Sequence, residues 1–147
     1  MMRPIDDNLL VLVDDDDEIV GYETKGNCHR DAGMLHRAFS IFIFNDRNEL
    51  LIQKRSGKKP LWPLYWSNSA CSHPRKGEEC AEAAERRLEE ELGFSSDLEF
   101  LYKFKYQAGF RDAGSENELC YVFLGRFRGS VEPDPEEIAD WKFVDLE

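Results

Sequence analysis

One amphipathic stretch, residues 78–92, constrains the fold more than any other part of this 147-residue chain. Small and apolar side chains recur along it at helical spacing, at Ala81, Ala84, Leu88 and Leu92. This spacing predicts a helix that buries one narrow stripe. Gly93 follows at the position where a glycine commonly ends a helix.

Strand-like segments flank the predicted helix on both sides. Residues 9–13 and 19–23 predict one hairpin, and residues 38–44 and 50–54 predict a second. Residues 57–74 hold three prolines and two tryptophans, which predicts a long ordered loop. After the helix we expect strands at 98–106, 118–126 and 141–144, a glycine-rich turn at 109–114 and a short acidic helix start at 133–139. These elements predict an α+β fold, with a mixed β-sheet packed with one central helix and flanking hairpins.

Composition narrows the class of protein and its partners. The length suits one domain over residues 1–147, and 41% hydrophobic with 33% charged residues is typical of a globular protein. No stretch approaches the ~20 apolar residues of a membrane helix. The N-terminus has no apolar signal-peptide core, so we expect a cytoplasmic protein. The net charge of −11 argues against nucleic acid as a partner, whereas a small anionic substrate fits if the few cations converge.

All three histidines, His29, His36 and His73, lie in polar or Gly/Pro-rich surroundings. Glu116 and Glu118 are spaced i, i+2, so a strand would present both carboxylates on one face. Three imidazoles and two carboxylates are a suitable ligand set for a divalent transition metal or Mg²⁺. The alternative is that the histidines are unrelated and the glutamates form an exposed strand edge.

Cys71 stands two residues before His73, in a loop that leads into the predicted helix. Helix N-termini and nearby cations lower the pKa of a thiol, which predicts a thiolate there, although a buried structural thiol is the alternative. The other cysteines, Cys28, Cys80 and Cys120, are expected to be structural. None of the four cysteines forms a Cys-x-x-Cys pair, which argues against a zinc ribbon or redox dithiol.

Several cations lie near these candidate site segments: Lys25, Arg55, Lys58, Lys59, Arg86 and Arg87. A diphosphate needs several such donors, and arginine can bind it with two hydrogen bonds. Arg87 and Glu91 share one flank of the predicted helix, one turn apart, and could face a site beside the core. For any one of these cations taken alone, a surface salt bridge is the alternative.

Residues 72–94 resemble a Nudix box. The chain supplies its glutamate, arginine, apolar and glycine positions in register, at Glu78, Arg86, Leu88, Glu90, Glu91, Gly93 and Phe94. It departs from the pattern at Ser72, where glycine is usual, and at Arg87, where glutamate is usual. In Nudix pyrophosphohydrolases that glutamate belongs to the metal-binding set, so the cation at this position argues against their usual chemistry.

Within the Nudix superfamily, the chain resembles the type 1 isopentenyl-diphosphate isomerases from about Leu9 to its end. Four segments carry the resemblance: residues 36–40, 66–74, 86–93 and 116–118. The resemblance implies an isomerase that interconverts isopentenyl diphosphate and dimethylallyl diphosphate by protonation and deprotonation. One alternative is a Nudix pyrophosphohydrolase acting on a nucleoside or other small diphosphate, and another is a non-catalytic diphosphate-binding domain.

The same resemblance implies roles for individual residues. Cys71 and Glu118 match the two proton-transfer residues, and Tyr106 matches a tyrosine that assists the acid. The ligands of a divalent metal, Mn²⁺ or Zn²⁺, match His29, His36, His73, Glu116 and Glu118. Glu91 matches the ligand of a second ion, Mg²⁺, that also holds the diphosphate. The diphosphate clamp matches Lys25, Arg55, Lys59 and Arg87.

For the chemistry, we assign Glu118 with Tyr106 as the acid and the Cys71 thiolate as the base. Trp66 and the strand at 39–44 are candidates for the wall of a dry pocket around a carbocation, with ordinary core packing as the alternative. Members of this family continue for some tens of residues beyond the predicted strand at 141–144, with an aromatic residue that covers the allylic cation. This chain stops at Glu147, so we expect the C-terminal extension to be absent or truncated and the pocket to be more open.

Overall fold

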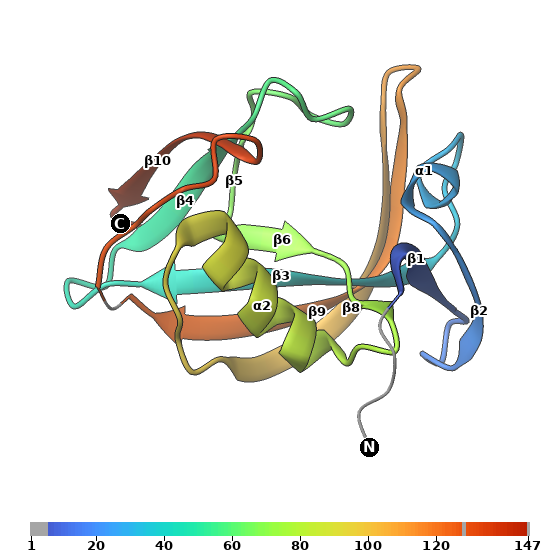
Figure 1. Cartoon of the computed structure of the whole chain (residues 1–147), viewed down its shortest axis with the longest axis horizontal. Helices are drawn as coiled ribbons and strands as arrows, with labels where there is room; N and C mark the ends of the chain where they lie inside the picture. Colours follow the sequence, from blue (N-terminus) through green and yellow to red (C-terminus); the bar gives the residue numbers. More distant parts are fainter. Residues whose placement is uncertain (1–5, 128, 147) are drawn as a thin grey trace.

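The computed structural model describes residues 6–127 and 129–146, as one curved mixed β-sheet with a single long helix across it (Figure 1). Strands β3 (His36–Phe44) and β9 (Gly114–Arg126) run parallel at its centre, with His36 opposite Glu118 and Phe44 opposite Arg126. Strand β8 (Glu99–Phe110) forms a long antiparallel hairpin with β9. The predicted α+β class and the mixed sheet are confirmed.

The first predicted hairpin is confirmed by β1 (Asp6–Val13) and β2 (Ile19–Thr24), which pair antiparallel. A short helix that the sequence did not predict, α1 (Lys25–Cys28), follows at once and begins with Thr24 as its N-cap. Strand β1 meets β3 at a single pair, Leu12 opposite His36. The hairpin therefore stands at the end of β3 that carries the candidate site.

The second predicted hairpin is correct only at its turn. Strand β4 (Leu50–Arg55) pairs with β3 at Phe44 and Leu50, and then diverges to pair along its length with β10 (Ile138–Val144). Strand β10 lies at the left of the molecule in Figure 1 and comes from the far end of the described chain. Residues 135–137 form a turn rather than the predicted helix start, so that prediction is wrong.

The segment predicted as a loop, residues 57–74, is only partly irregular. It contains β5 (Trp66–Ser67), which pairs with β4, and β6 (Ala70–Ser72), which pairs with β3. A further short strand, β7 (Arg75–Lys76), pairs with β1. Cys71 therefore sits on a strand, directly opposite Ser40.

Helix α2 (Cys80–Leu92) begins two residues later than predicted and ends at Gly93, which adopts a left-handed φ of 78°. A capping box joins Glu79 and Glu82 at its start. Ala83, Ala84, Leu88 and Leu92 are fully buried, whereas Ala81, assigned to the stripe, is exposed. Both ends of the helix are thus fixed by caps. The buried stripe is confirmed at Ala84, Leu88 and Leu92, and Cys80 and Ala83 are buried in place of Ala81.

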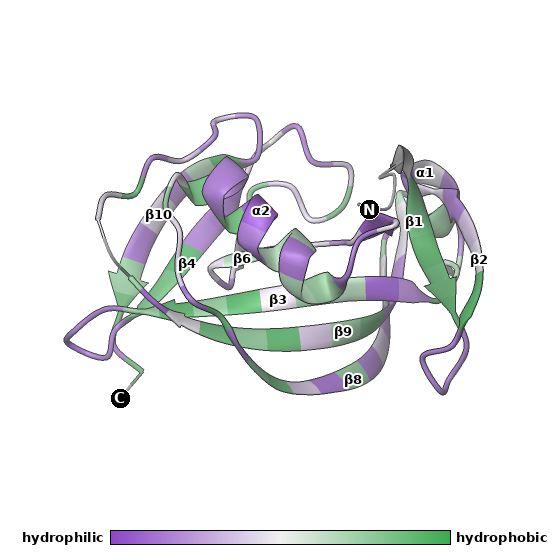
Figure 2. Ribbon diagram, turned by 60° about the horizontal axis from the view of Figure 1, so that its bottom comes forward, coloured by the Kyte–Doolittle hydropathy of each residue, from purple (hydrophilic) through white to green (hydrophobic). Residues whose placement is uncertain are grey.

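The helix packs on apolar side chains of the central strands. The ribbon of these strands is green at hydrophobic residues in Figure 2. Phe39, Ile41 and Ile43 of β3 are almost completely buried in this core. Each such side chain contributes on the order of 1.5–3 kcal/mol when removed from water. At 13 residues, α2 is the longest helix of the described chain, and no described helix has the length and apolar character to cross a membrane.

Candidate functional site

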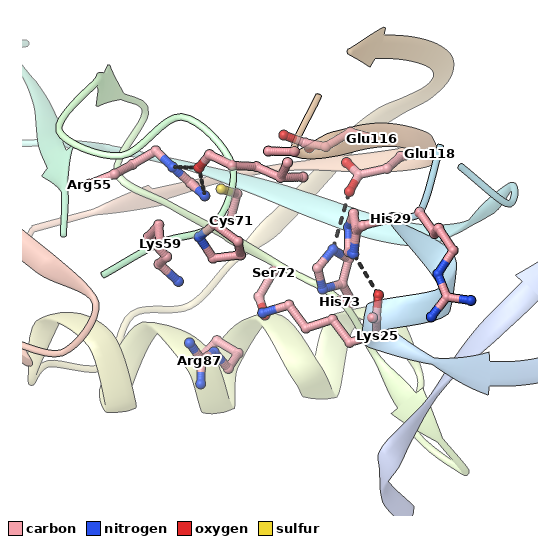
Figure 3. Close-up of a pocket in the computed structure, with 15 residues that line it drawn as sticks. Lys25, His29, Arg55, Lys59, Cys71, Ser72, His73, Arg87, Glu116 and Glu118 are labelled. Carbon is pink, nitrogen blue, oxygen red and sulfur yellow. Dashed lines mark hydrogen bonds and ion pairs between the residues drawn. The ribbon is translucent and has the colours of Figure 1, made fainter. Parts of the chain in front are cut away.

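A cavity of ≈ 480 Å³ opens between α1, the start of β9, the end of β4 and helix α2 (Figure 3). Most of the predicted site residues line it: Lys25, His29, Arg55, Lys59, Cys71, His73, Arg87, Glu116 and Glu118. His36, Glu91 and Tyr106 do not line it, and the first two are buried in its walls. The structure therefore brings together residues from five separate parts of the sequence.

The three imidazoles form a compact triangle. Their ring centroids are 5.0 Å apart for His29 and His36, 5.2 Å for His29 and His73, and 5.0 Å for His36 and His73. One donor atom from each of them and one oxygen of Glu118 lie within 4.8 Å of one another. Four of the five predicted metal ligands therefore converge on one point.

The hydrogen bonds of His29 and His36 leave the Nε2 lone pair of each ring free, whereas Nε2 of His73 lies 3.2 Å from Glu118 Oε2. The Nδ1 atoms of His29 and His36 lie 2.8 and 2.7 Å from the carbonyl oxygens of Lys25 and Met34, so Nδ1 carries the proton in both rings. The Nε2 atom of His36 is buried and has no hydrogen-bond partner among the described residues. A buried acceptor left without a donor fits a site built for a cation.

Protonation states also fit metal binding. Burial lowers the pKa of His73 to about 3, and burial is the main cause that lowers the pKa of His29. Both rings are thus neutral at pH 7, which is the form that binds a metal. Burial alone would raise the pKa of Glu118, but the adjacent His73, whose Nε2 atom lies 3.2 Å from Glu118 Oε2, lowers it. Glu118 is therefore a carboxylate.

The fifth predicted ligand, Glu116, lies outside the converging group. The Tyr106 hydroxyl lies 2.7 Å from Glu116 Oε2 and 2.7 Å from Glu118 Oε1, and so joins the two carboxyl groups. Burial and the charge of Glu118 raise the pKa of Glu116 to about 7. One phenol has one proton to donate, so it cannot satisfy both carboxylates at once, and the raised pKa of Glu116 favours a proton on that carboxyl group. Its role as a metal ligand stays a prediction.

The burial of Cys71 argues against the expected thiolate. Burial, reinforced by the negative charge of Glu91, raises the pKa of Cys71 to about 12, although Arg55 opposes the shift. Sequence reasoning placed Cys71 near a helix N-terminus and near cations, but it could not show how deeply the strand β6 buries the sulfur. Cys71 is a thiol at neutral pH.

Two local features hold the site residues in place. Gly114 has a φ of 138°, and a Cβ atom there would collide with the carbonyl oxygen of His29. The next residue, Ser115, donates its N–H to that carbonyl at 2.8 Å. Buried Ser69 donates its hydroxyl to the Leu51 carbonyl at 2.6 Å, which fixes the strand leading to Cys71. Because Gly114 has no Cβ, the end of α1 can lie close to the glutamates of β9.

The four clamp cations differ in how they are held. Arg55 donates from Nε and one terminal nitrogen to carbonyls of the 56–65 loop, including Leu61 O at 2.9 Å. Arg87 contacts Glu91 at 3.2 Å, and this glutamate is 4% exposed in its side chain. Lys25 has a lowered pKa, chiefly because of burial and then because Lys59 lies nearby. The cations therefore do converge in space.

Two further cations have surface or structural roles. Arg86 binds the carboxylate of buried Glu78 through two nitrogens, at 2.7 and 2.9 Å. Lys58 pairs with Glu136 at 2.8 Å, with both side chains exposed.

The predicted position of Trp66 in the cavity wall is wrong. Its side chain is 41% exposed on the surface, where Lys142 lies over the ring, and it does not line the cavity. Phe39 belongs to the hydrophobic core, which confirms the alternative interpretation of ordinary core packing.

One charged residue of the site was missed by sequence reasoning. Glu137 lies between Lys59 and Arg87, contacting the first directly and the second at 3.5 Å. Residues 133–139 showed only an acidic stretch in a chain that has 30 acidic residues. The signal that would identify Glu137 is the pairing of β10 with β4, which brings it beside Arg55.

Comparisons with known proteins show the family to which the chain belongs. Residues 34–147 match the sequence pattern of the NUDIX domain family. "Isopentenyl-diphosphate Delta-isomerase 1" of Aromatoleum aromaticum is 48% identical over 137 residues, which cover 93% of this chain and 77% of that protein. The protein of the same name from Photorhabdus laumondii is 46% identical over 139 residues, covering 93% and 79%.

Solved structures show the same fold at lower identity. DR0079 from Deinococcus radiodurans superposes with a TM-score of 0.75 at 24% identity, covering 92% of this chain and 82% of that one. A MutT protein from Methanosarcina mazei Go1 gives a TM-score of 0.65 at 18% identity, covering 76% and 78%. At these identities the likeness concerns the arrangement of strands and helix.

Proposed function

We propose a mechanism from the premise that this chain belongs to the NUDIX domain family and, within it, to the isopentenyl-diphosphate Delta-isomerases. It is an isomerase that interconverts isopentenyl diphosphate and dimethylallyl diphosphate. The observation that carries the mechanism is that Cys71 and Glu118 enter one cavity from different strands, β6 and β9. Two proton-transfer groups thus face the same bound substrate.

The reaction requires two proton transfers at carbon. Protonation of the terminal CH₂ of the isopentenyl alkene gives a tertiary carbocation, and loss of a proton from the adjacent CH₂ gives the dimethylallyl product. Cys71 and Glu118 are the two transfer groups, and Tyr106 connects Glu118 to Glu116. A general acid or base positioned in this way contributes about 10²–10⁴-fold to the rate.

The direction of the pKa shifts favours the reverse of the roles expected from the sequence. Cys71 holds its proton and Glu118 does not, so the thiol donates first and the carboxylate accepts. The proton on Glu118 can then be shared through Tyr106 with Glu116, whose pKa is about 7. Because the interconversion is reversible, each group has the opposite role in the other direction.

The residues fit a divalent metal at the three imidazoles and Glu118, as Mn²⁺ or Zn²⁺. When bound, such an ion supplies positive charge that fixes the Glu118 carboxyl and tunes its acidity. The proposed carboxylate ligand of Mg²⁺ near the diphosphate is Glu91, which contacts Arg87 at 3.2 Å. The identity of both ions is part of the proposal.

The substrate's diphosphate is held by Lys25, Arg55, Lys59 and Arg87. Lys25, Lys59 and Arg87 line the cavity on the side away from Glu118 in Figure 3. Arg87 occupies the position where the Nudix pattern has a metal-binding glutamate, and it supports binding of the diphosphate without its hydrolysis. A cytoplasmic location stays a prediction from the sequence.

One assay separates the alternatives. Purified protein is incubated with isopentenyl diphosphate, Mg²⁺ and Mn²⁺ or Zn²⁺, and the products are followed by NMR. Dimethylallyl diphosphate is the expected product, and its formation without release of phosphate supports the mechanism. Release of inorganic phosphate or monophosphate from this substrate would instead indicate a pyrophosphohydrolase, and no reaction with any metal would indicate a binding domain.

A further inference from the structure

Glu137 occupies the centre of the proposed diphosphate clamp, and no part of the mechanism uses it. Its Oε2 atom contacts Lys59 Nζ, and its Oε1 atom lies 3.5 Å from a terminal nitrogen of Arg87. The two clamp cations therefore meet on the two oxygens of one carboxylate. These side chains are only 16–23% exposed, so water screens the contact less than at the open surface.

The backbone around Glu137 is fixed rather than free. The N–H groups of Glu132 and Asp134 donate to the carbonyls of Leu92 and Glu91, at 2.8 and 2.9 Å. These carbonyls belong to the last turn of α2, where a helix has no partners of its own. The carbonyl of Glu137 accepts the N–H of Ser56 at 3.0 Å. The segment is thus anchored both to the helix and to the loop that carries Lys59.

The charge around Glu137 explains why a carboxylate lies there. Lys25, Arg55, Lys59 and Arg87 line one cavity, and their mutual repulsion opposes the empty site. Burial alone would raise the pKa of Glu137, but Lys59, Arg87 and Lys25 hold it below its usual range. Glu137 is therefore ionised, and it neutralises part of the charge that an anionic ligand would meet.

A phosphoryl group presents its oxygens to two cations much as a carboxylate does. A ligand with one phosphoryl group that binds between Lys59 and Arg87 exchanges one anion for another and gains little. A ligand with two phosphoryl groups can displace Glu137 and reach Lys25 and Arg55 as well. The contacts to Lys25 and Arg55 do not require Glu137 to leave, so a diphosphate bears a smaller part of the displacement penalty than a monophosphate bound between Lys59 and Arg87 does.

We propose that Glu137 is an internal counter-ion which occupies a phosphoryl position between Lys59 and Arg87, and that it sets the preference of the site for diphosphates over monophosphates. This inference rests on the proposed diphosphate clamp and adds a specificity-determining residue to it. The carboxylate keeps single phosphate groups out, because they cannot replace all the contacts they break. It also keeps the clamp cations together before the substrate arrives.

The test is calorimetric titration with two probes, inorganic diphosphate and inorganic phosphate, at fixed Mg²⁺. Glu137→Gln removes the charge at nearly constant shape. We expect it to bind phosphate about tenfold more tightly, equivalent to ~1.4 kcal/mol, with a smaller gain for diphosphate. The ratio of the two dissociation constants should therefore fall. Glu136→Gln is the matched control, because Glu136 pairs with Lys58 on the open surface, and its affinities should equal those of the wild type.

Glu137→Asp keeps the charge but withdraws it by one methylene group, so it should shift phosphate affinity in the same direction by a smaller factor. Glu137→Asp also provides the test if Glu137→Gln does not fold. Phosphate affinity that is unchanged or weaker in the folded variants would overturn the inference while leaving the clamp intact. Wild-type protein that fails to bind diphosphate at all would overturn the clamp, and this inference with it.

Discussion

Cys71 and His73 lie two residues apart, and burial drives both toward their neutral forms. The same burial raises the pKa of Glu116, while His73 beside Glu118 keeps that carboxyl ionised. The pKa values of the two adjacent carboxyl groups therefore shift in opposite directions, as in sites that need one proton donor and one acceptor. At the scale of single residues, burial and neighbouring charges separate protonated from ionised groups within one cavity.

Removing either proton-transfer group should abolish isomerisation with little change in folding. We expect Cys71→Ala and Glu118→Gln each to lower kcat by at least about 10²–10⁴-fold, measured as dimethylallyl diphosphate formed. Cys120→Ala is the control, because Cys120 is a buried thiol on β9 that does not line the cavity. Near-normal turnover in Cys71→Ala would show that this thiol is structural and that the mechanism is wrong.

His36 offers the sharpest test of the metal site, because its Nε2 atom is buried without a hydrogen-bond partner among the described residues. We expect His36→Ala to lower affinity for Mn²⁺ or Zn²⁺ at least about tenfold, on the scale known for residues around metal sites. Metal content after dialysis and the unfolding temperature with and without chelator report the change. If neither metal nor chelator changes the unfolding temperature of the wild-type protein, the prediction of a metal site here is wrong.

At the scale of elements, the site depends on the approach of α1 to the start of β9. Gly114→Ala adds a methyl group that collides with the His29 carbonyl, in a backbone conformation that L-residues rarely adopt. We expect weaker metal binding and lower turnover, with a loss of stability of about 1–3 kcal/mol. Gly21→Ala is the control, since a Cβ there makes only an ordinary contact of 3.8 Å with Leu12 and Gly21 does not line the cavity. Equal metal affinity in Gly114→Ala and wild type would show that His29 is not positioned in this way.

Local signals predicted those elements whose partners are close in sequence. The helix end at Gly93 and the hairpin of β1 and β2 follow from glycine chemistry and alternation, and both are confirmed. The parallel pairing of β3 with β9 and the union of β4 with β10 join distant segments, and no local pattern encodes them. In the second hairpin, β4 therefore separates from β3 after the turn and pairs with β10 instead.

The same distinction holds for the site. The histidines and Glu118 could be proposed from residue chemistry and family resemblance, and they converge as proposed. The protonation state of Cys71 depends on burial by several elements. The residues next to it in the sequence therefore gave the wrong prediction of a thiolate. Glu137 is one acid among many until β10 places it between Lys59 and Arg87. Tertiary contacts, rather than residue type, decide such positions.

At the scale of the whole molecule, charge is unevenly distributed. The chain carries −11 overall, yet Lys25, Arg55, Lys59 and Arg87 face one cavity. A local positive field in an acidic protein attracts a small anion while repelling polyanions. This arrangement agrees with a diphosphate substrate. It also predicts that the affinity for inorganic diphosphate falls as ionic strength rises.

A second charge cluster, on Asp17, joins parts of the sheet that are distant in sequence. Its carboxylate accepts from Arg37 of β3 at 2.7 Å, from Lys103 of β8 at 2.9 Å and from the Tyr121 hydroxyl of β9. The backbone carbonyl of Asp17 accepts a further bond from Arg37 at 2.9 Å. The β1–β2 turn is thereby attached to three strands, so this residue should affect the stability of the whole fold.

The pH dependence of stability should reveal this attachment. Burial alone would raise the pKa of Asp17, but the bonds from Lys103, Tyr121 and Arg37 hold it below its usual value. A depressed folded-state pKa stabilises the fold above the unfolded-state pKa of about 3.9, and that contribution is lost as pH falls through the folded-state value. We expect Asp17→Asn to lower the free energy of unfolding by about 1–3 kcal/mol at pH 7, with the difference from wild type shrinking below pH ~4. Urea unfolding across this pH range measures both quantities.

Asp15→Asn provides the comparison within the same turn. Asp15 pairs with Lys105 at 2.7 Å, but its side chain is 76% exposed, so water and salt screen the pair. Its loss should change stability by less than about 1 kcal/mol at any pH. If the two variants behave alike, the stability of the sheet does not depend on the Asp17 cluster. A constant deficit of Asp17→Asn down to pH 2 would contradict the charge argument, because it would show that packing rather than ionisation of this carboxyl holds the turn.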